Sequence, residues 1–204
     1  ARNHTGKNYV LNLDLEDFFP SITYTRVVKS LHELGFNEEV SDIIARICTV
    51  PMWDELKQMW RNALPQGSPA SPLLSNIVCS SLDHRLSALA QRYGVTYSRY
   101  ADDMTFSSNH SVYAQDGAFF KELEDIIKSS GFKINQKKTR LQKKGSRQEV
   151  TGLIVGEKIN TYRQFTKNLR AAVFHADTNG CTPHEFNKIM GRVSYLAMVK
   201  GPDD

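Results

Sequence analysis

The stretch YSRYADDMTFSS, Tyr97 to Ser108, places two adjacent aspartates inside a segment whose aromatic residues and threonine otherwise predict a strand. Asp is depleted in strands, and two neighbouring carboxylates repel each other. A turn between two strands would accommodate the pair, because Asp is a common turn residue. A cation held by the carboxylates would accommodate it too. The stretch therefore predicts a hairpin with Asp102 and Asp103 at its tip, and leaves a structural and a metal-binding interpretation open.

The composition is that of a globular protein. The chain has 204 residues, of which 40% are hydrophobic and 24% charged, which is enough for one large domain with a real core. No apolar run approaches the roughly 18 residues that a membrane-spanning helix needs, and no signal peptide precedes the fold. We therefore expect a cytoplasmic protein without a membrane partner. Because the chain begins at Ala1 and not at methionine, we also expect a fragment or a processed piece.

The three cysteines are scattered and form no CxxC pair. An odd and scattered set argues against a disulfide framework and against a zinc site.

Hydrophobic periodicity predicts strands and helices on both sides of the hairpin. Residues 9–14 alternate as a strand with Asp14 near its end. Residues 71–93 have apolar residues at helical spacing, with Ser71 as cap and Gly94 as stop, and predict one long helix. Met52 to Ala63 is ambiguous. The remaining segments predict helices or short strands: helices within 20–35 and over 38–49, 113–130, 164–175 and 183–200, and strands near 132 and over 150–155.

This order of elements favours an α+β fold, in which an antiparallel sheet has helices packed on one face. Asp14 then ends one strand, and Asp102 and Asp103 lie at the tip of a hairpin. If the two strands are neighbours, three carboxylates converge, and their repulsion would raise at least one pKa. A pair of Mg²⁺ ions would relieve it, since Mg²⁺ binds carboxylate and phosphate oxygens. Spacing alone does not decide between this site and ordinary turn aspartates.

Five segments, in order, resemble the motifs of reverse transcriptases. YADD resembles their Tyr-X-Asp-Asp box, NLDLEDFFPSI their first catalytic motif, and LPQGSPASP the motif that opens the long palm helix. GFKINQKKT is similar to their lysine-bearing motif, and VTGLIV to the hairpin that grips the primer. The resemblance implies a polymerase right-hand palm, with some fingers-proximal helices, over residues 1–155. It also implies the start of a partial helical thumb over 156–204, with the fingers largely missing.

Two short signals resemble retron-type bacterial enzymes: AxxH at Ala1 to His4 and VTG at Val150 to Gly152. The resemblance implies an RNA-directed DNA polymerase that copies a structured noncoding RNA into DNA, as in retron msDNA synthesis and antiphage defence. It implies an RNA template, an RNA–DNA hybrid, dNTPs and a retron effector protein as partners. A group II intron-like or abortive-infection reverse transcriptase is an alternative, and a noncatalytic RNA-binding palm module is another.

The resemblance also assigns the metal chemistry. Asp14, Asp102 and Asp103 match the metal-binding carboxylates, and the Leu15 carbonyl matches a further ligand. The ions would be two Mg²⁺, with Mn²⁺ as an alternative. Two metals about 4 Å apart can hold the attacking and leaving oxygens of an in-line phosphoryl transfer.

Seven positions match residues that contact the incoming nucleotide or the primer end: Asp17, Phe18, Phe19, Gln66, Gly67, Tyr100 and Ala101. The first two would act through backbone amides. Phe19 matches the steric gate, where a bulky ring leaves no space for a 2′-hydroxyl; packing in the core is the alternative for both phenylalanines.

Residues 126–148 contain no acidic residue and eight basic ones. A solvated face has the same composition, but such a run also suits a phosphate backbone. Lys138 matches a lysine that protonates the departing pyrophosphate, with Lys137 as the rival. Gly152 and Leu153 match the primer grip. The residues expected along the primer–template duplex are the basic strip, which we define as Lys137, Arg140, Lys143 and Lys144.

Overall fold

A four-stranded sheet carries the Asp-Asp hairpin. Its strands lie in the order β4 (Thr96–Tyr100), β5 (Asp103–Ser108), β1 (Tyr9–Asp14) and β6 (Arg140–Lys143). The neighbouring positions of β1 and β5 confirm the arrangement on which the convergence of Asp14 with the hairpin depends. Strand β1 is buried over its four central residues, and Asp14 at its end is half-buried. With the paired strands of the smaller sheets antiparallel, the α+β fold is as predicted.

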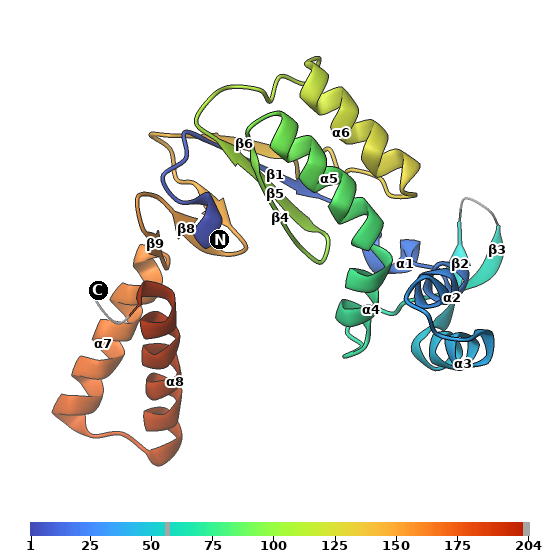
Figure 1. Cartoon of the computed structure of the whole chain (residues 1–204). Coiled ribbons are helices and arrows are strands. Elements are labelled where there is room, and N and C mark those ends of the chain that lie inside the picture. Colours follow the sequence, from blue (N-terminus) through green and yellow to red (C-terminus); the bar gives the residue numbers. More distant parts are fainter. Residues whose placement is uncertain (56–57, 202–204) are drawn as a thin grey trace. The chain divides into compact units, whose positions relative to one another are not determined.

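The computed structural model describes residues 1–55 and 58–201. These residues fall into two units (Figure 1). One unit holds residues 1–10, 107–110 and the chain from 141 onward; the other holds 11–106 and 111–140. The second unit carries the predicted catalytic residues.

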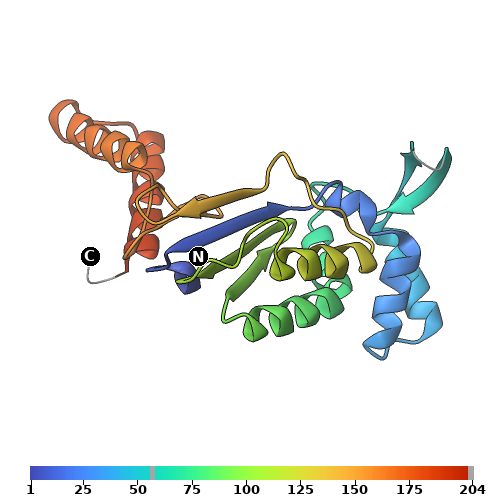
Figure 2. The same ribbon diagram turned by 90° about the horizontal axis from the view of Figure 1, so that it is seen from above.

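Two helices cover one face of the sheet in the second unit. Helices α5 (Ser80–Arg92) and α6 (Ala118–Ser129) lie side by side there (Figure 2). Their apolar stripes are buried at Leu82, Leu86 and Leu89 in α5 and at Phe119 and Leu123 in α6. The buried β5 residue Phe106 meets Phe119 edge-on, with ring centroids 5.6 Å apart. This packing fixes the sheet against the helices and leaves the ends of β1 and β4 to form a site.

Three expected elements differ from the structure. The expected helix over 71–93 is two helices, α4 (Ser71–Val78) and α5, because the backbone leaves helical geometry at Cys79 (φ −84°, ψ 1°). Buried apolar residues continue at helical spacing from α4 into α5. The hydrophobic pattern therefore did not reveal the break between the two helices. Helix α6 begins after Gly117 and not at 113. Near residue 132 no strand forms; one antiparallel bridge joins Leu15 to Ile134.

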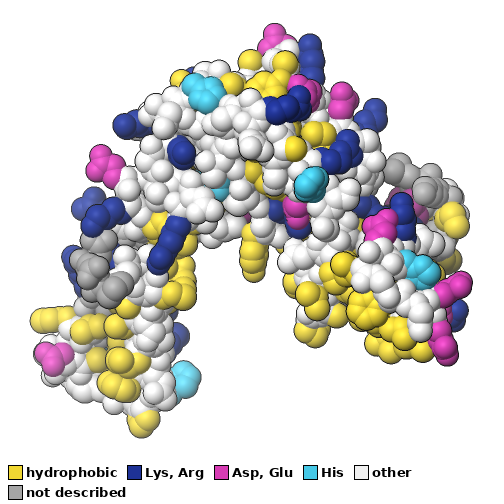
Figure 3. Space-filling view, viewed as in Figure 1, with side chains coloured by type: hydrophobic (Ala, Val, Ile, Leu, Met, Phe, Trp, Pro, Cys, Tyr) yellow, Lys and Arg dark blue, Asp and Glu magenta, His cyan; other side chains and the backbone are white. Residues whose placement is uncertain are grey.

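The ambiguous segment is a hairpin of β2 (Val50–Asp54) and β3 (Met59–Ala63). It follows the short α1 (Phe18–Ser21), α2 (Tyr24–Glu33) and α3 (Glu38–Cys48). Trp53 pairs with Trp60 across the hairpin, with ring centroids 5.7 Å apart. Both tryptophans are exposed, and so is Ile47 on α3. Hydrophobic side chains are accordingly visible over this part of the space-filling view (Figure 3).

The first unit consists of short strands and a helical hairpin. Strands β7 (Glu149–Val150), β8 (Leu153–Val155) and β9 (Ile159–Asn160) form an antiparallel sheet, and α7 (Arg163–Asn179) packs against α8 (Pro183–Lys200). A capping box between Thr182 and Glu185 starts α8. The expected helices over 164–175 and 183–200 are therefore confirmed, the first with four more residues at its C-terminal end. None of the helices in the described part of the chain has the length and apolarity to cross a membrane.

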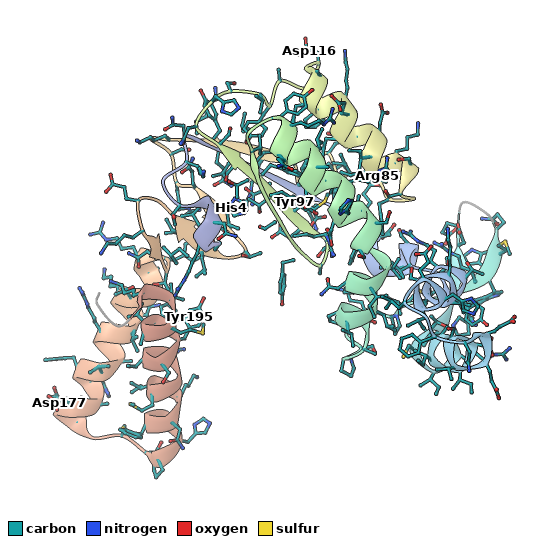
Figure 4. The ribbon with its side chains drawn as sticks, viewed as in Figure 1. His4, Arg85, Tyr97, Asp116, Asp177 and Tyr195 are labelled. Atoms are coloured by element: carbon teal, nitrogen blue, oxygen red, sulfur yellow. The ribbon has the colours of Figure 1, made fainter. Side chains whose placement is uncertain are left out.

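The 3-10 turn η1 (Arg2–His4) is tied to β5 within the first unit. His4 is completely buried, and its Nδ1 lies 2.7 Å from the Ser107 hydroxyl. Figure 4 shows His4 at this turn. Burial lowers the pKa of the imidazole to about 4, with nearby positive charge adding to the effect. The histidine of the AxxH segment is thus a neutral structural side chain in this fold.

All three cysteines are free thiols.

Candidate active site

The Asp-Asp turn is joined to the end of β1 through its backbone. The Leu15 amide donates to the Asp102 carbonyl over 3.1 Å. Ala101, which precedes Asp102, has a left-handed backbone with φ 52°, a conformation that costs a residue other than glycine about 1–2 kcal/mol. The turn that presents the two aspartates is therefore strained, and hydrogen bonds around it hold it in place.

A second segment lies along the other side of residues 14–16. The Glu16 amide donates to the Lys133 carbonyl over 2.8 Å, and the Asn135 amide donates to the Asp14 carbonyl over 2.8 Å. These bonds flank the bridge between Leu15 and Ile134. Because the chain then turns at Asn135, the following lysines come back over Asp14. The lysine-bearing segment and the first aspartate, far apart in sequence, are thereby brought together.

A polar cavity of about 500 Å³ lies at this junction. It is lined by nine of the predicted site residues: Asp14, Leu15, Asp17, Phe18, Phe19, Gln66, Asp102, Lys137 and Lys138. Three residues not predicted complete the lining: Glu16, Pro20 and Asn135. Asn135 belongs to the lysine-bearing motif, so the sequence contained a signal for it. Its contact with Asp14 is a hydrogen bond from its backbone amide to the Asp14 carbonyl, which a motif does not reveal.

Lys138 forms the main electrostatic contact of the cavity. Its Nζ lies 3.0 Å and 3.1 Å from the two carboxylate oxygens of Asp14. The hydrogen bond to Asp14 raises the pKa of Lys138, Asp14 adds a charge effect, and the negative charges of Asp102 and Asp103 act in the same direction. One ammonium group thus experiences all three predicted carboxylates. Lys137 lines the same cavity without this contact: its backbone amide donates to the Asn135 side chain.

The predicted metal ligands fit a divalent cation by their chemistry. Asp14 and Asp102 line one cavity and present hard oxygen ligands. The Asp14 side chain is 19% exposed, and its carboxylate already holds a cation, the Lys138 ammonium. Within residues 1–55 and 58–201, however, no three His, Cys, Asp or Glu side chains are arranged to hold a metal ion. That Asp14, Leu15, Asp102 and Asp103 together coordinate two metal ions therefore stays a prediction.

The two adjacent phenylalanines differ in environment. Phe18 is buried and stacks on Phe132, with ring centroids 5.5 Å apart. Phe19 is half-buried, meets Phe18 edge-on at 5.2 Å, and lines the cavity. Asp17 before them has a left-handed backbone, φ 44°, and directly precedes α1. The first ring is therefore a core residue, and the second is placed where it can contact a ligand.

Three predicted nucleotide-contact residues and the third aspartate are not among the residues that line this cavity. Tyr100 at the end of β4 is 74% exposed. Gly67 has φ 87°, so the turn after Gln66 needs a residue without a side chain. Asp103 begins β5 and is half-buried. Ala101 is the strained turn residue described above. The cavity thus collects part of the predicted site, and the rest surrounds the Asp-Asp turn.

The predicted primer grip forms a tight turn in the first unit. Val150 pairs with Leu153, and the two residues between them have positive φ: Thr151 at 46° and Gly152 at 77°. Leu153 is half-buried and Gly152 exposed. The four residues of the basic strip are all exposed. Lys137 and Arg140 belong to the second unit, and Lys143 and Lys144 to the first.

Comparison with known proteins agrees with this architecture. Residues 1–166 match the family model described as "Reverse transcriptase (RNA-dependent DNA polymerase)". The chain is 38% identical to the Retron Ec86 reverse transcriptase of Escherichia coli, over 98% of this chain and 58% of that protein. It is 36% identical to the Retron Mx162 reverse transcriptase of Myxococcus xanthus, over 98% of this chain and 46% of that protein. The chain thus spans about half the length of these curated relatives.

Solved structures add a likeness of fold alone. Telomerase from Candida albicans, in a complex with a fragment of telomeric RNA, superposes with a TM-score of 0.55 at 12% identity, over 97% of this chain and 40% of that one. Apo telomerase from Candida tropicalis superposes with a TM-score of 0.52 at 11% identity, over 75% of this chain and 35% of that one. The family model matches most of the chain, and the retron enzymes are 36–38% identical to it over 98% of its length; the chain therefore belongs to the reverse transcriptase family and is similar to its bacterial retron members.

Proposed function

We propose that this chain carries the polymerase site of an RNA-directed DNA polymerase, with a palm over residues 1–155 and the start of a thumb over 156–204. One observation carries the proposal: Asp14 and Asp102 line the same cavity, and the amide of Leu15, the residue after Asp14, donates to the Asp102 carbonyl. Nucleotidyl transfer needs carboxylates so placed beside a space that can hold a triphosphate.

Divalent metal dependence follows from the family. In this chain Asp14, Asp102 and Asp103, with the Leu15 carbonyl, would hold two Mg²⁺ ions, and Mn²⁺ is the alternative. Bound there, the ions would lower the pKa of the primer hydroxyl and neutralise charge on the triphosphate. The protein's part is to hold the carboxylates at the ends of two neighbouring strands, so that little reorganisation is needed when substrate arrives.

The start of α1 would contact the triphosphate and the sugar. The first N–H groups of a helix have no acceptor within the helix, so the amides of Asp17 and Phe18 are suitable donors to phosphate oxygens. The ring of Phe19 would lie against the sugar and exclude a 2′-hydroxyl, which favours dNTPs. Gln66 and Gly67 would contact the nucleotide and template, and Tyr100 and Ala101 the primer end.

Lys138 would act as the proton donor for the departing pyrophosphate. A lysine ammonium is protonated at neutral pH, which is the state that a general acid needs. In this role the side chain would turn from the Asp14 carboxylate, which it contacts here, toward the phosphates once substrate binds. Gly152 and Leu153 would grip the primer, and the basic strip would follow the phosphates of the RNA–DNA hybrid.

The retron relatives favour a structured noncoding RNA as template and msDNA as product. A role in antiphage defence with an effector protein follows the same resemblance. A cytoplasmic location, expected from the sequence, is part of the proposal as well.

Primer extension on a defined RNA template tests the proposal. With Mg²⁺ and all four dNTPs, the protein should extend an annealed DNA primer to the template's 5′ end, with a product sequence complementary to the RNA. Pre-digestion of the template with ribonuclease should abolish the product. If the protein binds the primed RNA but adds no nucleotide, it is an RNA-binding module and the proposal is wrong.

A further inference from the structure

An ion pair between a buried arginine and a half-buried aspartate lies next to the Asp-Asp turn and takes no part in the roles above. Arg99, the residue before Tyr100, has a side chain that is only 4% exposed. Its guanidinium meets the carboxylate of Asp83 on α5 in a two-pronged contact: Nε to Oδ1 at 2.8 Å and Nη2 to Oδ2 at 2.6 Å. Burial alone would lower the pKa of Arg99, but the hydrogen bonds and charge of Asp83 outweigh it and raise the pKa. The group is therefore a permanent cation with its charge balanced.

The free edge of the same guanidinium reaches the strained turn. Arg99 Nη1 donates to the carbonyl of Ala101 over 3.0 Å, and Ala101 is the residue with left-handed φ. On the far side of this peptide, the carbonyl of Asp102 accepts the Leu15 amide. The turn that presents Asp102 is thus fixed from two directions, by the Arg99 guanidinium and by the end of β1.

Arg99 also contacts the two other elements that form the nucleotide pocket. Its Nη2 donates to the Asn76 side chain on α4 over 3.3 Å, and α4 follows the loop that contains Gln66 and Gly67. Its guanidinium carbon lies 6.0 Å from the ring centroid of Phe18, the neighbour of the proposed steric gate. Four of the five N–H donors of arginine are used in these hydrogen bonds. A lysine could not span them, because its donors radiate from a single nitrogen.

Tyr97 fixes the other partner of the pair. Its hydroxyl donates to Asp83 Oδ1 over 2.8 Å, and its ring stacks on Phe106 with centroids 4.8 Å apart. Figure 4 shows Tyr97 between β4 and α5. Burial and the Asp83 carboxylate raise the pKa of this phenol, so the hydroxyl keeps its proton and remains a donor. Asp83 is therefore oriented by a rigid aromatic ring.

We propose that Arg99, oriented by Asp83 and Tyr97, is a positioning residue for nucleotidyl transfer. It holds the Ala101–Asp102 turn at the end of β1 and fixes the positions of α1 and α4 beside this turn. It touches neither substrate nor metal. This inference rests on the proposed polymerase function. It adds that catalysis needs, besides the aspartates, a side chain that holds the turn on which Asp102 lies.

The test compares Arg99→Lys with Arg92→Lys, a closely matched control. Arg92 is the last residue of α5, and it pairs with Glu122, whose carboxylate likewise accepts a tyrosine hydroxyl, from Tyr93 at 2.7 Å. That pair is far more exposed, with Arg92 at 60%, and has no contact with the turn. Tyr97→Phe, which keeps the ring and removes only the hydroxyl, serves as a second variant in case Arg99→Lys folds poorly.

Two readouts are used on the full chain. In steady-state extension of an RNA-templated primer, Arg99→Lys should lower kcat about 10–100-fold with KM for dNTP changed less than about threefold, since pre-organisation and not ground-state binding is lost. Tyr97→Phe should give a smaller loss in the same direction, and Arg92→Lys should keep the wild-type kcat. Amide hydrogen exchange at Leu15, measured without substrate, should accelerate at least about tenfold in Arg99→Lys, less in Tyr97→Phe and not in Arg92→Lys, because this amide donates to the Asp102 carbonyl.

The exchange readout does not depend on catalysis, so the two proposals can fail separately. A wild-type protein that makes no DNA contradicts the polymerase proposal, whatever Leu15 does. If the wild type polymerises but Arg99→Lys matches Arg92→Lys in both kcat and Leu15 exchange, Arg99 is only a buried packing contact and the inference is wrong. A lower kcat with unchanged Leu15 exchange would also overturn it, because the loss would then not come through the turn.

Discussion

At the scale of single residues, the two phenylalanines after Asp17 give the sharpest contrast. Both side chains line the cavity, but Phe18 is buried and stacks on Phe132, whereas Phe19 is half-buried. Phe19→Ala should raise the use of ribonucleotides relative to deoxynucleotides by at least about tenfold, since a pocket wall that excludes one group is worth about 1–3 kcal/mol. The measurement is the ratio of kcat/KM for rNTP and dNTP on one primed RNA template.

Phe132→Leu is the control for that prediction. It removes the ring that stacks on Phe18 and should lower stability while leaving the sugar preference unchanged. If Phe19→Ala leaves the preference unchanged as well, Phe19 is a packing residue and not the gate.

Lys138 and Lys137 are adjacent in sequence, and the structure separates them by one contact, that of Lys138 with Asp14. Lys138→Ala should slow the chemical step about 100-fold or more, as the loss of a general acid does, and Lys137→Ala less than about tenfold. Single-turnover incorporation at saturating dNTP measures both. A larger loss for Lys137→Ala would reverse the assignment.

At the scale of elements, His4 links the first turn of the chain to β5 through Ser107. The folded imidazole has a pKa of about 4, whereas in the unfolded chain it is near 6.5. Between these values the unfolded state binds a proton that the folded state does not, so the free energy of unfolding falls as the pH falls. From pH 7 to pH 5 the loss from this group is about 2 kcal/mol.

Urea unfolding at pH 7 and pH 5 measures that loss, and His4→Gln should remove most of the difference between the two pH values. The exposed His84 on α5 is the matched control, because His84→Gln should leave the difference in place. An unchanged pH dependence in His4→Gln would mean that the imidazole is protonated in the folded state.

The sequence predicted most helices and strands, but neither the break between α4 and α5 nor the β2–β3 hairpin. Strand 9–14, the Asp-Asp hairpin and the amphipathic helices were predictable because each has its own hydrophobic period. The break at Cys79 was not, since Leu74 before it and Leu82 after it are both buried and keep the helical spacing. The β2–β3 hairpin was ambiguous because its residues are largely exposed and its strands lack clear alternation.

The site was predictable only in part, for a physical reason. Motif resemblance supplied the aspartates, the phenylalanines and the lysine, and the structure brings most of them to one cavity. The contacts of Asn135 with Asp14, and of Arg99 with Asp83 and Ala101, join segments that are distant in sequence or depend on a single left-handed residue. Neither kind of contact leaves a period or a spacing in the sequence.

At the scale of the whole molecule, the basic strip predicts how affinity for an RNA–DNA hybrid depends on salt. Each phosphate that a lysine or arginine neutralises contributes about 0.9 to the slope of log K against log salt concentration for a duplex. Lys143→Ala and Arg140→Ala should each lower that slope by about 1, measured by fluorescence anisotropy from 50 to 300 mM KCl. Lys121→Ala, an exposed lysine on α6, should not. Equal slopes in all variants would remove the strip from the nucleic-acid surface.

The central claim is that Asp102 performs catalysis and does not merely form a turn. The most direct measurement is RNA-templated dNTP incorporation by wild type, Asp102→Asn and Asp116→Asn, with RNA affinity measured in parallel. Asp116 is an exposed aspartate in the loop before α6 (Figure 4). We predict that Asp102→Asn loses at least about 100-fold in rate with RNA affinity within about twofold of wild type, and that Asp116→Asn polymerises normally. Incorporation by Asp102→Asn at the wild-type rate would contradict the account.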